Sequence, residues 1–189
     1  MSAITGDDGR KRCHWGAEPA DYRQYHDTEW GKPVHGQRAM FERLCLESFQ
    51  SGLSWLTILR KRPAFRAAFA DFEPRRVAEF DDHDRQRLLA DRGIVRNRAK
   101  IDAIVGNARA VLELDRPLDE LLWSFAPEPG ARTRPGTSAE VPANTPESSA
   151  MSARLRGCGF RFVGPTTCYA LMQATGMVDD HVAECWLAE

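Results

Sequence analysis

The sequence lacks any apolar run near the length of about 18 residues that a membrane-spanning helix requires. The segment Met1–Asp8 also contains no apolar stretch of the kind found in export signals. We therefore expect a cytoplasmic protein without a membrane partner. Internal repeats, alternating strand patterns and a β-α-β rhythm are absent as well, and their absence argues against a solenoid and against a parallel sheet.

The cysteines show no pairing pattern. They are odd in number and scattered over the chain, at positions 13, 45, 158, 168 and 185. Because a disulfide framework needs an even and regularly spaced set in an exported chain, free thiols or metal ligands are the better interpretation.

The chain also lacks a large excess of charge of either sign. The chain carries 26 basic and 27 acidic residues, for a formal net charge of -1 and a pI near 6.5. Such a protein has no overall attraction for a polyanion, so any contact with DNA must be local. Basic residues do gather locally, at Arg60, Lys61, Arg62 and Arg66, at Arg92, Arg96, Arg98 and Lys100, and at Arg154, Arg156 and Arg161. Each of these clusters can equally be a solvated helix face.

What the sequence does contain is helical periodicity. With 189 residues, 42% of them hydrophobic, the chain can bury one substantial core, and we expect an all-α monomer. The clearest amphipathic stripe comprises Ile101, Ile104, Val105, Ala108, Val111 and Leu112. Helices are predicted over residues 37–50, 54–62, 64–72, 73–78, 98–114, 118–125, 149–156 and 166–175. Pro63 is expected to interrupt the second of them.

The domain organisation follows from composition. Residues 1–11 are polar and predict a flexible N-terminus, whereas 12–189 predict a single domain of two helical lobes. The stretch 126–150 holds five prolines and many serines and threonines, which predicts a long surface loop rather than a helix.

Four residues form a candidate metal site that joins the two ends of the chain. Twelve residues separate Cys13 from His26, and His181 stands four residues before Cys185. A spacing of four places two side chains on one helical face, and a Cys2His2 set suits a structural zinc ion with four closed ligands. Buried thiols and hydrogen-bonded histidines are the alternative, because the spacing lacks the Cys-x2-Cys half of a zinc finger.

Aromatic residues crowd the first third of the chain, at Trp15, Tyr22, Tyr25, Trp30 and Trp55. Aromatic faces can sandwich a planar ligand and favour a cationic one, although such residues often only fill a core.

Glu47 stands at the edge of the apolar face of the predicted helix 37–50. A carboxylate at a core border is costly unless it is paired or meets a ligand, so it either accepts hydrogen bonds from a purine amine or forms a salt bridge to an arginine.

The segment from residue 84 to 114 has the pattern of a helix-hairpin-helix, with a tight turn around Gly93 between two helices. The backbone N–H groups of such a turn and the following helix N-terminus can hold a DNA phosphate. A single glycine is a weak signal, and helical hairpins of other proteins share it.

Taken together, these stretches resemble the 3-methyladenine DNA glycosylase I family within the helix-hairpin-helix glycosylase superfamily. The matching motifs cover nearly the whole chain in the family's order: CHW at 13–15, YHDTEWG at 25–31, CLESFQSGLSW at 45–55, GIVRNR at 93–98, GNA at 106–108, WSF at 123–125, GFRFVG at 159–164 and DDH at 179–181.

The resemblance implies a helix-hairpin-helix glycosylase fold whose ends are tied by zinc through Cys13, His26, His181 and Cys185. It also implies a monofunctional base-excision repair enzyme that flips 3-methyladenine out of double-stranded alkylated DNA and removes it by hydrolysis. The implied site residues are Glu47 as catalytic, base-reading carboxylate, Tyr25 and Trp55 stacking on the base, Tyr22, Trp15 and Trp30 shaping the pocket, and Leu53, Gly93, Arg96 and Arg98 contacting DNA.

The aspartate that related glycosylases carry after the hairpin is expected to be missing. Asp102 and Asp115 stand near that position, and we expect neither to act. No lysine stands where a Schiff base is expected, so strand cleavage is not predicted. The alternatives are a zinc-stabilised helical DNA-binding or adaptor protein, and an unrelated hydrolase with a Cys-His pair.

Overall fold

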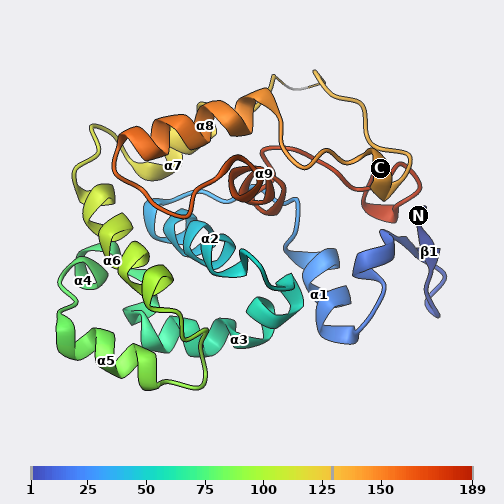
Figure 1. The fold of residues 1–189 in the computed structure, drawn as a ribbon. Helices are drawn as coiled ribbons and strands as arrows, with labels where there is room; N and C mark the ends of the chain where they lie inside the picture. The colour runs from blue at the N-terminus through green and yellow to red at the C-terminus, as the bar shows by residue number, and fades with distance from the viewer. Residues whose placement is uncertain (1, 129, 189) are drawn as a thin grey trace.

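The computed structural model describes residues 2–128 and 130–188, and this part of the chain is almost entirely helical (Figure 1). The α-helices are α1 (Ala20–Thr28), α2 (Gln37–Gln50), α3 (Trp55–Ala68), α4 (Pro74–Ala78), α5 (Asp82–Ala90), α6 (Arg98–Leu112), α7 (Leu118–Trp123), α8 (Pro146–Gly157) and α9 (Pro165–Ala174). Short 3-10 helices cover His14–Gly16, Ala70–Phe72, Ser138–Glu140 and Trp186–Ala188. The predicted all-α class is confirmed for the described residues, apart from one short hairpin.

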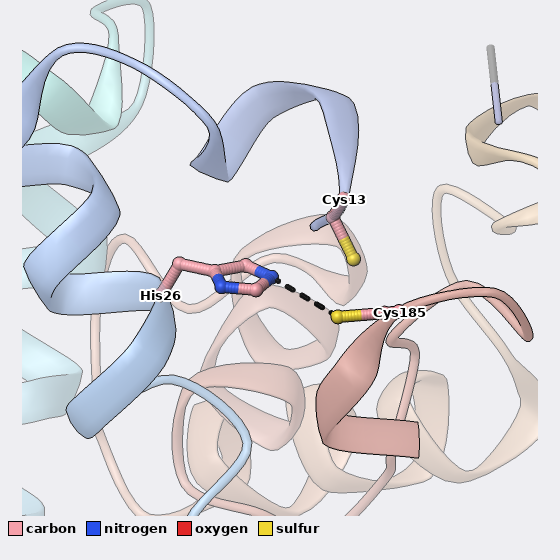
Figure 2. Close-up of side chains that lie close together, drawn as sticks. All are labelled: Cys13, His26 and Cys185. Carbon is pink, nitrogen blue, oxygen red and sulfur yellow. Dashed lines mark hydrogen bonds between the residues drawn. The ribbon is translucent and has the colours of Figure 1, made fainter. Parts of the chain in front are cut away.

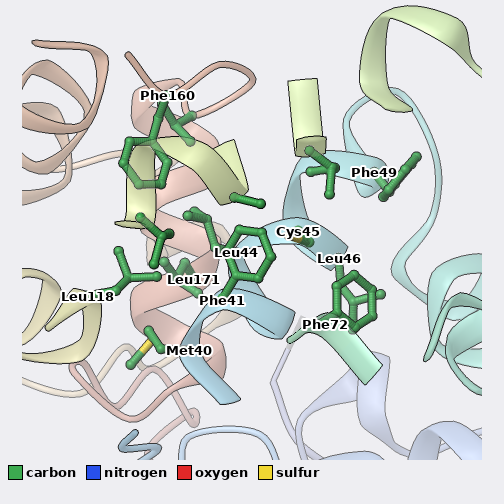
Figure 3. Packing of buried hydrophobic residues seen from close by; sticks show 14 of the residues in the cluster. Met40, Phe41, Leu44, Cys45, Leu46, Phe49, Phe72, Leu118, Phe160 and Leu171 are labelled. Carbon is green, nitrogen blue, oxygen red and sulfur yellow. The ribbon is translucent and has the colours of Figure 1, made fainter. Parts of the chain in front are cut away.

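Helix α2 is the centre of the fold and packs against α3, α6, α7 and α9. Its residues from Met40 to Phe49 are buried apart from Arg43, so apolar side chains leave the helix in nearly every direction (Figure 3). A helix that is apolar around most of its circumference belongs inside a core. The predicted bounds 37–50 are confirmed, and the helix ends where Gly52 adopts a φ of 81°, a conformation that glycine tolerates.

Helix α3 corrects two predictions. It continues through Pro63 to Ala68, although a proline removes one backbone hydrogen bond from a helix. The reason is tertiary, because Ile58 before the proline and Phe65 after it are both fully buried in the core. The predicted helix 64–72 then ends early, since Ala70–Phe72 form a 3-10 turn with positive φ angles.

The segment near the N-terminus contains regular structure that we did not expect. Strands β1 (Ile4–Thr5) and β2 (Lys11–Arg12) pair in antiparallel fashion, and this hairpin lies on the same side of the molecule as the 3-10 helix Trp186–Ala188 (Figure 1). Arg12 is 2% exposed and is bonded by Asp8 and Asp27, which explains how a polar segment can be ordered. The flexibility of residues 1–11 and the division of 12–189 into two lobes stay predictions.

The predicted loop 126–150 is shorter than expected. It ends at Thr145, whose hydroxyl accepts a hydrogen bond from the Ser148 N–H while Ser148 bonds back to the Thr145 N–H, and Pro146 follows in the first turn of α8. Met1, Pro129 and Glu189, which belong to the predicted segments 1–11, 126–150 and 12–189, lie outside the described residues.

The predicted helical hairpin is present as α5 and α6, joined by a turn over residues 91–97. Asp81 caps α5 and Asn97 caps α6, each by accepting a backbone N–H three residues on. The buried Lys100 of α6 donates to the carbonyl oxygens of Phe49 (2.8 Å) and Ser51 (2.6 Å). The hairpin is thereby attached to the turn that follows α2. No helix among the described residues has the length and hydropathy needed to cross a bilayer.

Candidate functional site

One cavity collects the aromatic residues that the sequence singled out. It has a volume of about 270 Å³ and is bounded by α1, α2, α3, α9 and the loop 126–145. The six predicted pocket residues all line it: Trp15, Tyr22, Tyr25, Trp30, Glu47 and Trp55. A cavity of this size lies just below the range of pockets for drug-sized ligands and suits one small planar molecule.

The aromatic rings form a connected wall. The centroids of the Tyr25 and Trp55 rings are 5.3 Å apart, at an angle of 45°. The centroid of the Trp15 ring lies 4.9 Å from the centroids of both the Tyr22 and the Trp30 ring, in tilted and edge-on geometry respectively. Such contacts stabilise the wall and leave π faces for a ligand.

Glu47 has no ionic partner in the described residues, although it is only 5% exposed. The alternative prediction, a salt bridge to an arginine, is therefore wrong. Burial raises the pKa of Glu47 to about 8, and the nearby Arg43 charge only partly opposes this effect. By contrast, Glu42 on the same helix lies 2.7 Å from Arg66 and 3.7 Å from Arg43.

Two buried polar atoms on the cavity wall have no hydrogen-bond partner in the described part of the chain. They are Oε2 of Glu47 and Nε1 of Trp55. An unpaired buried polar group costs about 1–3 kcal/mol. Burial also raises the pKa of Tyr22 to about 12 and that of Tyr25 well above its ordinary value, so both phenols keep their protons at neutral pH. The cavity thus offers unsatisfied donors and acceptors between aromatic faces, which is complementary to a flat polar ligand.

Three of the four candidate metal ligands meet beside this cavity (Figure 2). Ligand atoms of Cys13, His26 and Cys185 all lie within 4.8 Å of one another, and all three side chains are buried. The His26 Nε2 atom is 3.6 Å from the Cys185 sulfur. A tetrahedral zinc ion at about 2.0–2.3 Å from its ligands separates them by about 3.3–3.8 Å, so this spacing fits.

The two thiols lie close together. The neighbouring Cys13 lowers the pKa of Cys185, and the neighbouring Cys185 raises that of Cys13. The backbone N–H of Val182 also points at the Cys13 sulfur, at 3.4 Å. The neighbouring Cys13 favours a thiolate at Cys185, and the Val182 N–H favours one at Cys13. The thiolate is the form that binds metal.

His181 corrects the predicted geometry in one respect. Residues 181–185 form a loop and turn instead of a helix, so the spacing of four does not act through a helical face. The segment is held by the Cys13 contact and by Asp179, whose carboxylate bonds both the backbone N–H and the Nδ1 atom of His181. His181 is not part of the three-residue cluster, but its Nε2 is buried without a partner among the described residues, and its ring lies 5.1 Å from that of His26.

Each histidine is oriented by an aspartate that is itself held by an arginine. Asp27 lies 2.8 Å from His26 Nδ1 and accepts bonds from Arg12. Asp179 lies 2.8 Å from His181 Nδ1 and accepts bonds from Arg134. Both Nε2 atoms are thereby turned away from the aspartates, that of His26 toward the Cys185 sulfur, and carboxylate–histidine pairs of this kind are usual around zinc.

Leu53 lies beside the cavity on the turn after α2. It is 43% exposed, so its apolar side chain is accessible from solvent. A second cavity of about 270 Å³ lies between this turn and Thr166 and Thr167 of α9, and it shares Glu47 and Gln50 with the first. The leucine therefore lines a hollow whose wall includes Glu47.

The hairpin turn is tightly built. A Cβ atom at Gly93 would lie 2.9 Å from the Cβ of Ala64, so the chain passes too close for a side chain. Lys61 donates to the carbonyl oxygens of Arg92 and Gly93 and attaches the turn to α3. Arg96 and Arg98 are exposed and form no ion pair within the described residues.

Neither alternative aspartate reaches the cavity. Asp102 pairs with Arg85 at 3.0 Å, and Asp115 lies 3.7 Å from Arg154. Gln50, Gln173 and Asp180 do line it, and sequence reasoning assigned them no role. Asp180 was visible only as part of the DDH motif, and Gln173 carried no signal of its own.

Within the described residues, the mostly helical fold, the aromatic cavity and the buried unpaired carboxyl group suit an enzyme that binds a planar base. The model of the methyladenine glycosylase family matches residues 15–188, and the chain belongs to this family of N-glycosyl hydrolases.

The relatives agree with this assignment. The chain is 45% identical over 178 residues to DNA-3-methyladenine glycosylase 1 of Escherichia coli K12, which covers 93% of this chain and 95% of that protein. A crystal structure of a 3-methyladenine DNA glycosylase I matches with a TM-score of 0.90 and 42% identity, over 94% of this chain and 100% of the other. A variant of such an enzyme in complex with 3-methyladenine matches with a TM-score of 0.88 and 33% identity, over 94% and 97% of the two chains.

Proposed function

We propose that this protein excises 3-methyladenine from double-stranded alkylated DNA by hydrolysing the N-glycosyl bond, as a monofunctional enzyme that leaves the strand uncut. The observation that carries the proposal is the pair of unpaired buried atoms, Glu47 Oε2 and Trp55 Nε1, in a cavity walled by aromatic rings. The names of the relatives, one of them bound to 3-methyladenine, supply the base.

The cavity selects a cationic base by its charge. An adenine alkylated at N3 is positively charged while it is attached to the sugar, and its glycosidic bond is already weakened. Tyr25 and Trp55 present negative π faces to such a ring. Glu47, whose pKa is about 8 in the empty cavity, ionises readily beside a cation and not beside neutral adenine. Glu47 is thus the catalytic carboxylate that holds the alkylated base, while Trp15, Tyr22 and Trp30 shape the pocket.

The base must leave the helical stack to reach Glu47, at a cost of roughly a few kcal/mol. Leu53 is placed to fill the gap, since it is exposed beside the hollow whose wall includes Glu47. The backbone at Gly93 and the unpaired Arg96 and Arg98 then hold phosphates through the helix-hairpin-helix.

A structural zinc ion completes the proposal. Cys13, His26 and Cys185 fit a tetrahedral ion, and the unpartnered Nε2 of His181 supplies a fourth donor. Zinc contributes folding energy at such a closed site and ties the two ends of the chain together. Asp27 and Asp179 hold the imidazoles in the required orientation.

The chemistry needs water rather than an amine. No lysine lines either cavity in the described residues, and Lys100 is engaged by the carbonyls of Phe49 and Ser51. A Schiff base, and with it strand cleavage, is therefore not expected. The enzyme is proposed to work as a monomer.

The test is release of free base from alkylated duplex DNA, measured by chromatography, with gel analysis of the strand. Wild type should release 3-methyladenine and leave the strand intact. Glu47→Gln should slow release by roughly 10- to 100-fold, the loss of a charged hydrogen bond. A protein that binds the duplex but liberates no base, and in which Glu47→Gln changes nothing, would be a binding or adaptor protein and would refute the proposal.

A further inference from the structure

Two residues from the C-terminal third of the chain form a polar wall of the cavity that the proposed function does not use. Gln173 comes from α9 and Asp180 from the segment after it, and both line the cavity together with Glu47 and Trp55. Asp180 is 3% exposed. A polar wall of this kind needs an explanation, because polar groups at a buried surface are retained only when they are bonded or meet a ligand.

The Asp180 carboxylate is held by three hydrogen-bond donors. One oxygen accepts hydrogen bonds from the Tyr169 hydroxyl and from Gln173 Nε2, the latter at 2.8 Å. The other oxygen is 3.2 Å from the Arg132 guanidinium, which can only donate. Arg132 belongs to the loop 126–145, and its guanidinium also lies over the Tyr169 ring. Three donors from three side chains therefore hold this carboxylate in place.

The Asp180 carboxylate determines which way the Gln173 amide is turned. Its oxygen must face a donor, so the amide nitrogen of Gln173 points toward Asp180. The reverse orientation would bring the amide oxygen against a carboxylate oxygen, and the two acceptors would repel each other. Gln173 lines the cavity, and its Oε1 is the amide atom that has no hydrogen-bond partner within residues 2–128 and 130–188.

We propose that Gln173 is a second reader of the base, whose Oε1 accepts a hydrogen bond from the exocyclic amine, and that Asp180 is the positioning residue that fixes this orientation. The amine carries two N–H donors, and Glu47 can accept only one of them in good geometry. Gln173 then takes the other. A purine with an oxygen at that position presents an acceptor to an acceptor, so the pair also rejects oxo-purines. This inference rests on the proposed base.

The experiment compares two free bases. Tryptophan fluorescence of the full chain is titrated with 3-methyladenine and with 3-methylpurine, which lacks the amine. Gln173→Met should weaken 3-methyladenine binding by roughly 3- to 10-fold, the effect of a neutral hydrogen bond, and leave 3-methylpurine binding unchanged. The matched control is Gln86→Met on the exposed face of α5, which should bind both bases as wild type does.

Asp180→Asn tests the positioning role of Asp180. It is also the alternative test of the proposal if Gln173→Met does not fold. An asparagine offers both a donor and an acceptor, so the Gln173 amide can turn over, and the preference for 3-methyladenine should fall. The double variant should lose no more preference than Gln173→Met alone, because Asp180 acts through Gln173. Metal content is measured for each variant, since Asp180 precedes His181.

The outcomes separate the two claims. An equal loss for both bases, no loss at all, or additive losses in the double variant would overturn the reading role of Gln173 while wild type still releases 3-methyladenine from DNA. Failure of wild type itself to bind or release 3-methyladenine would overturn the proposed function and this inference with it.

Discussion

Glu47 should make the empty protein less stable as the pH rises. Its pKa is about 8 in the folded chain because the carboxyl group is buried, against an ordinary value of 4.5. Below pH 4.5 both folded and unfolded chains are protonated at this position. Between pH 4.5 and 8 the unfolded chain has lost a proton that the folded chain keeps, so the free energy of unfolding falls with pH. At about 1.4 kcal/mol for each pH unit, the loss is about 3 kcal/mol at pH 7 and about 5 kcal/mol above pH 8.

Glu47→Gln removes this loss, since glutamine has nearly the same shape and no charge. In urea unfolding at pH 4.5, 7 and 8.5, the variant and wild type should be nearly equal at the lowest pH. The variant should be more stable by roughly 3 kcal/mol at pH 7, with a larger difference at pH 8.5. A difference that does not change with pH, or a variant that is less stable at pH 8.5, would refute the reasoning about burial.

Glu42→Gln is the matched control. Glu42 lies on the same helix and is also buried, but Arg66 and Arg43 neutralise it. Removing its charge leaves Arg66 without an ionic partner among the described residues, while Arg43 keeps Glu29. This variant should therefore be less stable than wild type at pH 7, the opposite sign from Glu47→Gln.

Three further predictions concern DNA access and the metal cluster. Leu53→Ala should slow base release from duplex DNA and leave the affinity for free 3-methyladenine, measured by fluorescence titration, unchanged. A parallel loss in both would show that Leu53 shapes the cavity and does not fill the gap that the extruded base leaves in the DNA. Asp27→Asn should weaken zinc binding by roughly 10- to 100-fold in a chelator competition, because the Asp27 carboxylate orients His26, and unchanged affinity would contradict that role. Removal of metal by a chelator should lower the melting temperature by several degrees, and addition of zinc should restore it. A melting temperature that changes with neither treatment would exclude a structural zinc at Cys13 and Cys185.

The local sequence pattern was enough to predict the bounds of two helices, the amphipathic α6 and the buried α2. The bounds of α2 match the predicted 37–50, and α6 differs from its prediction by two residues at the C-terminal end. Apolar periodicity and caps act over one or two turns, so they can be seen in the sequence itself. The aromatic residues and Glu47 could also be singled out from the sequence, because their motifs stand close together in the first 55 residues.

The failures lie where distant contacts override local preference. Pro63 does not end α3, because the buried Ile58 and Phe65 hold the helix on both sides. Residues 181–185 share a spacing that suits a helix, but Cys13 and Asp179 hold them in a turn. The burial of Ile58 and Phe65 and the contact with the distant Cys13 depend on tertiary packing, which the spacing of residues along the chain does not reveal.

The sequence by itself therefore determined the class of the fold, the main helices and the chemical types assembled in the site. Only the tertiary structure decided that Glu47 has no ionic partner, that His181 stands apart from the three-residue cluster, and that Gln173 and Asp180 wall the cavity. The reason is that burial and pairing of polar groups depend on which helices pack together. Here α9 packs on α2 and brings residues 173 and 180 beside residue 47, more than 120 positions away in the chain.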